Sequence, residues 1–228
     1  MKNLVIMSAM ALMAINANAE KVKFEISGVV ADSIKEVVVI VNNDKNSSQK
    51  VTVANGRFNA VGEAEKNDLL NVGHEINRGF NSLVAINDGQ PIKMNFVENT
   101  VSGSSENSAL GNQIKANAAD EGRMAVLVKE YRELSKQNTA EADARIKEIM
   151  AEANAIEEKN MKASLEYIKA HKGDVTPVAF IQNVMYELSY NELAEIINPD
   201  VAYFNHPMVA KAKRLMDGLK KRMPRAMF

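Results

Sequence analysis

The spacing of apolar residues changes once along this chain, near Gly103. Before that point apolar and polar residues alternate, as they do over residues 22–26, and a period of two is typical of half-buried β-strands. After it, apolar residues recur every three or four positions, which is the period of amphipathic helices. A run of strands followed by a run of helices predicts the α+β class. We therefore predict a β-sandwich-like domain over residues 20–104 and a helical domain over residues 105–228.

The first domain is predicted to hold roughly seven or eight short strands, with a turn about every ten residues. This pattern is typical of an antiparallel sandwich or barrel. Asn55-Gly56 and Asp88-Gly89 are dipeptides that favour β-hairpins, because they readily adopt the positive φ angles of tight turns. We therefore expect the strands on either side of each dipeptide to pair with one another.

Two long helices are predicted in the second domain, with a break near Asn138 and Thr139, so that they form a helical hairpin. Thr139 is expected to cap the second of them. Shorter helices should follow, one opening at Pro177 and the last at His206 and Pro207. The apolar stripe predicted for the first long helix consists of Leu110, Ile114, Met124, Val128, Tyr131 and Leu134.

Residues 1–19 have the features of a secretory signal peptide. Lys2 precedes an apolar run that ends at Ile15, and Ala17-Asn18-Ala19 matches the small-residue cleavage pattern. The run is shorter than the roughly 20 apolar residues that span a bilayer. We therefore expect cleavage after Ala19, no transmembrane span, and a protein exported to the periplasm or cell envelope.

The chain contains no cysteine. This excludes disulfides, a CxxC redox pair, a thiolate zinc site and a cysteine nucleophile. The 28 basic and 29 acidic residues give a net charge of -1, so the chain lacks the basic field of proteins that bind nucleic acid. We expect no nucleic acid among its partners.

Three histidines, His74, His171 and His206, are the only imidazoles, and their spacing matches no known zinc motif. His74 lies at the same strand parity as Val72, so a place in the core or at a sheet edge is expected for it. The glycines are scattered singly and form no phosphate-binding loop. We therefore predict no metal site and no cofactor.

Gly103-Ser104-Ser105 begins like the nucleophile elbow of serine hydrolases, but the second glycine of that motif is missing. Since the segment joins a strand to a helix, Ser104 or Ser105 is expected to cap the helix. Two carboxylates brought together by the fold could still act as a glycosidase pair. The chain is thus predicted not to be an enzyme, and a hydrolase with an acidic or serine site remains an alternative.

Two regions are candidates for contact with a partner. One is the junction between the domains, because clefts favour domain interfaces. The other is the basic C-terminus, which could dock onto an acidic partner or onto an anionic envelope surface, although cations near a helix end also complement its dipole. The candidate residues are Ser104, Ser105, Asn107, Lys220, Lys221, Arg222 and Arg225.

Four motifs carry a resemblance to a known family. They are Phe24-x-Ile26-x-Gly28-Val29-Val30, Val51-x-Val53-x-Asn55-Gly56-x-Phe58, Asn87-Asp88-Gly89-x-Pro91-Ile92 and Val101-x-Gly103-Ser104-x-x-Asn107-x-x-Leu110. In this order they resemble the β-rich N-terminal domain of unknown function, with its following helical segment, of TlpA-like (AhpC/TSA-type) exported bacterial thiol-disulfide oxidoreductases. The resemblance extends roughly from Phe24 to Leu219.

The catalytic unit of that family is a thioredoxin-like domain with a CxxC pair, and dithiol exchange requires thiols that this sequence lacks. The resemblance therefore implies the fold and the compartment without the redox activity. We predict a non-enzymatic exported module that binds a partner protein or a small ligand. An accessory role beside a separate thioredoxin-like oxidoreductase is an alternative.

Overall fold

The computed structural model describes residues 20–76 and 79–222 of the chain. Eight strands form two four-stranded sheets in the first half, and helices make up the second half. The predicted α+β class is thereby confirmed. The segment predicted to be a signal peptide lies outside the described residues.

The two sheets lie face to face and enclose one hydrophobic core. One has the strand order β4-β1-β7-β8 and the other β3-β2-β5-β6. Every second residue of β1 from Phe24 to Gly28 is buried, as the alternation in the sequence predicts. The strands are β1 (Lys21–Val29), β2 (Glu36–Val41), β3 (Gln49–Thr52), β4 (Arg57–Glu65), β5 (Leu69–Ile76), β6 (Gly79–Ile86), β7 (Ile92–Asn95) and β8 (Thr100–Ser102).

Both predicted hairpins are wrong as strand pairings. Asn55 and Gly56 do form a tight turn with φ angles of 52° and 69°, but β3 then pairs with β2 and β4 with β1. After Asp88-Gly89 the chain likewise crosses to the other sheet, where β7 runs parallel to β1. A turn dipeptide fixes only the local reversal of the chain, whereas the pairing partner is set by which arrangement buries the apolar faces.

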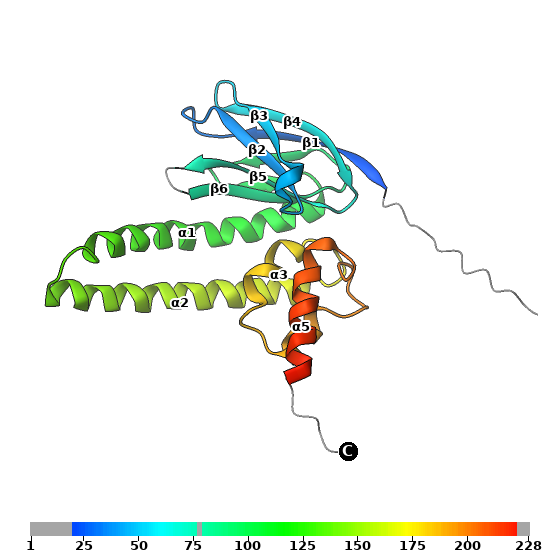
Figure 1. Ribbon diagram of the computed structural model, residues 1–228. Helices are drawn as coiled ribbons and strands as arrows, with labels where there is room; N and C mark the ends of the chain where they lie inside the picture. Colours follow the sequence, from blue (N-terminus) through cyan, green and yellow to red (C-terminus); the bar gives the residue numbers. More distant parts are fainter. Residues whose placement is uncertain (1–19, 77–78, 223–228) are drawn as a thin grey trace, which may run out of the picture.

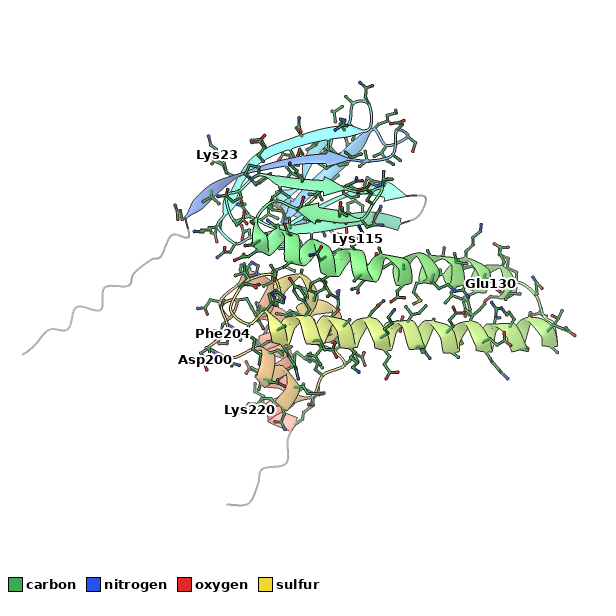
Figure 2. All side chains as sticks on the ribbon, turned by 180° about the vertical axis from the view of Figure 1, so that it is seen from behind. Lys23, Lys115, Glu130, Asp200, Phe204 and Lys220 are labelled. Atoms are coloured by element: carbon green, nitrogen blue, oxygen red, sulfur yellow. The ribbon has the colours of Figure 1, made fainter. Side chains whose placement is uncertain are left out.

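The helices follow in the order α1 (Ser105–Leu134), α2 (Ala140–Ala170), α3 (Val178–Val184), α4 (Tyr190–Ile196) and α5 (Ala210–Arg222), with one-turn 3₁₀ helices at Lys45–Ser47 and Pro207–Val209. Figure 1 shows α1 directly beneath the sandwich, α2 beneath α1, and the shorter helices gathered at the end of α2. Figure 2 shows Lys220, in α5, at the side of the molecule away from the sandwich. The predicted hairpin of long helices is present.

The start of α1 covers one open side of the sandwich, where β6 and β8 are the last strands of their sheets. Gly111 lies so close to β8 that a Cβ atom there would overlap the carbonyl oxygen of Val101. Asn107 is fully buried, and its Oδ1 and Nδ2 bond the backbone N–H and C=O of Ile86 at 2.8 and 2.9 Å. The start of α1 is therefore attached to the backbone of β6 and β8, and Leu69 and Ile86 of the sandwich also join the helical core.

The far half of the helical hairpin extends beyond the sandwich as an arm (Figure 1). Leu127 and Ile149 are buried there, but Val128 and Tyr131 are 42% and 43% exposed, so the prediction that these two belong to the core is wrong. The reason is that α1 has only α2 as a neighbour in the arm, and a single neighbouring helix covers only a narrow stripe of side chains.

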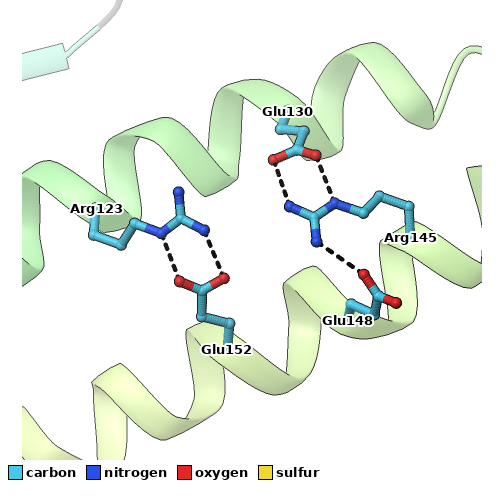
Figure 3. A network of polar contacts seen from close by, with 5 residues as sticks. All are labelled: Arg123, Glu130, Arg145, Glu148 and Glu152. Carbon is cyan, nitrogen blue, oxygen red and sulfur yellow. Dashed lines mark hydrogen bonds and ion pairs between the residues drawn. The ribbon is translucent and has the colours of Figure 1, made fainter.

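Ion pairs connect the two helices of the arm (Figure 3). Both oxygens of Glu130 accept hydrogen bonds from the Arg145 guanidinium, and both oxygens of Glu152 accept from Arg123. These bonds lower the pKa of each of the two carboxyls. Bidentate geometry of this kind fixes the register of the two helices.

His206 docks the last helix onto the sandwich. Its Nδ1 accepts a hydrogen bond from the N–H of Met208, so Nε2 carries the proton that is donated to the carbonyl of Asn67, 3.0 Å away. Burial lowers the pKa of His206, although the contact with Asn67 and the charge of Asp68 oppose this.

We expect the free energy of unfolding to fall as the pH drops from about 7 to about 5, because the unfolded chain takes up a proton at His206 more readily than the folded chain. His206→Asn keeps a capping acceptor but removes the titration, so its stability should fall less steeply over that range. Urea unfolding of both proteins at several pH values measures the difference. Equal slopes for the two proteins would show that His206 is not involved.

Candidate functional site

A groove of about 760 Å³ lies between α1, α2 and α3. This volume falls in the range of pockets that hold small ligands. Beside the groove α1 and α2 are linked by the ion pair of Lys159 with Asp120, farther along the arm by that of Arg123 with Glu152, and near α3 by the helical core. It is larger than the second pocket, which lies on the sandwich.

The floor of the groove is apolar. Phe180 of α3 is 6% exposed and is one of the lining residues. Ile114 and Met161 are half-buried and belong to the edge of the helical core, and Met124 and Ile156 extend the apolar lining toward the arm. A ligand with an apolar part would therefore gain from the burial of its surface here.

Four glutamates surround this floor. They come from α1, α2 and the turn after α3, and they are Glu121, Glu157, Glu158 and Glu187. No lysine or arginine is among the lining residues. Within residues 20–76 and 79–222, no ion pair engages any of the four.

The nearest cations along α1 and α2 already have partners. Arg123 donates to Glu152 at 2.5 and 2.7 Å, and Lys159 lies 2.7 Å from Asp120. Partial burial raises the pKa of Glu121 although its side chain still reaches solvent. Four carboxylates without an ion pair among the described residues therefore lie close to an apolar surface.

Amide side chains complete the lining. Asn160 lies in the groove, and its Oδ1 is buried and has no hydrogen-bond partner among the described residues. An acceptor left in this state costs about 1 to 3 kcal/mol. Asn117, Asn154 and Asn183 are further lining residues.

The sequence interpretation did not find this groove. Ile114, Asn117, Glu121 and Met124 lie at spacings of three, four and three, so they share one face of α1. The interpretation of that face as an apolar stripe passed over the two polar residues within it. Their position inside a hydrophobic pattern was the signal that could have located the groove.

The junction residues have structural roles. The Oγ of Ser104 accepts the N–H of Asn107 at 3.1 Å, which confirms Ser104 as the cap of α1, and Ser105 is the first residue of that helix. Both Asn107 side-chain atoms are bonded to the backbone of Ile86. None of these three predicted contact residues lines the groove, and their role in binding stays a prediction.

The predicted basic surface lies elsewhere. Lys220, Lys221 and Arg222 form the exposed last turn of α5, and Arg225 lies outside the described residues. Earlier in α5, Lys213 lies over the ring of Phe204 with its Nζ 3.3 Å from the ring centre. The groove and the basic turn are thus built on different helices.

Each histidine has its own contacts in the fold. His74 is buried in β5 beside the ring of Phe96, as the strand parity predicts. His171 pairs with Asp174 at 2.9 Å, and the hydroxyl of Thr176 bonds the other oxygen of that carboxylate. Thr176 is fully buried, so its hydroxyl cannot reach a substrate.

The described part of the chain holds no group of three or more potential metal ligands. In the same residues, no helix is long and apolar enough to cross a membrane. No protein-family model, no curated protein and no solved structure matches this chain.

Proposed function

We propose that this protein is an exported binding protein without catalytic activity, and that its groove takes a basic peptide segment with apolar side chains. The observation that carries the proposal is the set of four glutamates around an apolar floor, none of which forms an ion pair within residues 20–76 and 79–222. The signal-peptide pattern of residues 1–19 supports export.

A basic segment satisfies the groove better than a neutral or acidic one. Opposite charges across an interface speed association and exclude partners of the wrong sign. A lysine or arginine would supply the positive charge that none of the described lining residues provides. Apolar side chains of the same segment would cover the floor formed by Ile114 and Phe180.

The test is calorimetric titration of the protein with an eight-residue peptide of alternating lysine and leucine. Replacing all four glutamates by glutamine is expected to weaken binding at least about ten-fold and to remove most of its salt dependence. The variant carries Glu121→Gln, Glu157→Gln, Glu158→Gln and Glu187→Gln.

A matched control changes four exposed glutamates of the sandwich to glutamine and leaves the groove intact. These are Glu63→Gln, Glu65→Gln, Glu75→Gln and Glu98→Gln. The control should bind the peptide as the wild-type protein does. Equal loss in both variants would mean that only net charge matters, and tight binding of a glutamate-leucine peptide would contradict the proposal directly.

A further inference from the structure

A second pocket, of about 470 Å³, opens on the outer face of the sheet β4-β1-β7-β8. Its lining side chains include two cations, Arg57 and Lys93, and the hydroxyls of Ser27, Thr100 and Ser102. No carboxylate is among its lining residues. Its charge is therefore opposite to that of the groove between the helices.

The strand register arranges these side chains in two parallel rows. Asn59 pairs with Ser27, Ser27 with Lys93, and Lys93 with Ser102, so one row crosses all four strands. With strands about 4.8 Å apart, this row is about 14 Å long.

The neighbouring row, two residues further along each strand, begins at Arg57 and passes Val29 and Asn95 to reach Thr100. Alternate residues of a strand point to the same face, so both rows face outward. Phe58, between the two rows on β4, is 3% exposed and points into the core.

The two cations have no partner within the described ranges, where neither an ion pair nor a side-chain hydrogen bond engages Arg57 or Lys93. Lys50, on the other sheet, is by contrast paired with Glu36 at 2.9 Å. Glu25 is the nearest carboxylate along β1. It lies two residues before Ser27, whereas Val29, which pairs with Arg57, lies two residues after Ser27.

We propose that this pocket binds an acidic saccharide. Arg57 and Lys93 would hold its acid groups, and Asn59, Ser27 and Ser102 would bond its hydroxyls. Guanidinium and ammonium groups recognise carboxylate and sulfate oxygens. The two cations stand on strands about 10 Å apart across the sheet, which suits acid groups on neighbouring sugar units better than one inorganic anion.

This site is independent of the groove that the proposed function uses. The groove is formed by α1, α2 and α3, whereas the pocket lies on four strands of one sheet. No aromatic side chain lines the pocket with its ring exposed, so a neutral sugar has no surface on which to stack. Recognition should therefore depend on the acid groups.

The probe is the disaccharide of galacturonic acid, titrated into the full chain by calorimetry, with neutral digalactose and inorganic sulfate as comparisons. The digalacturonate is expected to bind, and neither comparison compound should bind as tightly. Arg57→Gln and Lys93→Gln should each weaken binding about ten-fold, and the double variant should abolish it. The melting temperature of each variant should stay unchanged, because both side chains are exposed.

Lys23→Gln is the matched control, because Lys23 is an exposed cation on the same face of β1 and lies outside the pocket (Figure 2). It should leave the affinity within about two-fold. Absence of digalacturonate binding, or binding that the double variant keeps, would overturn the proposal. Equal affinity for sulfate alone would also overturn it, because the site would then recognise a bare anion.

Discussion

Gly111→Ala is expected to lower the free energy of unfolding by about 2 to 3 kcal/mol. Alanine normally stabilises a helix by about 1 kcal/mol relative to glycine, so the predicted effect has the opposite sign. The added Cβ would overlap the carbonyl oxygen of Val101 and lie 2.8 Å from its carbonyl carbon. These are backbone atoms of β8, so no side-chain rotation relieves the overlap, and α1 would have to move away from the sheet.

Gly122→Ala is the control for this prediction. Gly122 lies in the same helix, and a Cβ built there meets no heavy atom within 4 Å apart from its chain neighbours and the backbone of its own helix. We expect this variant to be more stable than the wild-type protein by about 0.5 to 1 kcal/mol. Guanidinium unfolding monitored by circular dichroism measures both changes, and a stabilised Gly111→Ala variant would refute the close packing of α1 on β8.

Asn107→Leu is expected to lower the free energy of unfolding by about 2 to 4 kcal/mol, because it leaves the buried N–H of Ile86 without its partner and removes one of the two donors to the Ile86 carbonyl, the other being the N–H of Asp88. Leucine has the same heavy-atom branching at Cγ as asparagine but can neither donate nor accept a hydrogen bond, so the loss reports mainly on the two hydrogen bonds of 2.8 and 2.9 Å. Hydrogen exchange at the Ile86 amide should also become faster. Asn112→Leu, at an exposed position of the same helix, should change stability by no more than about 0.5 kcal/mol.

The outcome for Asn107 also bears on the interpretation of the domain junction. A large stability change with unaltered peptide binding in the groove would assign Asn107 to the fold alone. Conversely, a variant that folds normally and loses peptide binding would show that the domain junction contributes to binding.

Local signals in the sequence predicted the elements well. The cap at Thr139 is present, with its Oγ1 accepting the N–H of Ala142 at 3.2 Å, and the last helical segment begins at His206 and Pro207 as expected. A cap depends on three or four neighbouring residues, so it can be recognised without knowledge of the fold. The alternation of apolar and polar residues in β1 predicted a strand for the same reason, because it depends only on neighbouring residues.

Pairings between distant residues could not be predicted in this way. Ile26 of β1 lies beside Ile92 of β7 in a parallel pair. Nothing in the sequence around either residue indicates that the two strands pair. The turn at Asn55-Gly56 was correctly located, yet it connects two sheets. The same limit applies to the groove, whose glutamates come from two long helices and from the turn after a third element.

The position of α1 has a consequence for how the protein can be divided. A fragment ending at residue 104 would lose the helix that shields β6 and β8, and both strands would present unpaired N–H and C=O groups to solvent. Uncovered strands of this kind recruit further copies and lead to aggregation. The sandwich is therefore expected to be insoluble when produced alone, and a fragment that continues through the first turns of α1 is the shortest one that should remain monomeric.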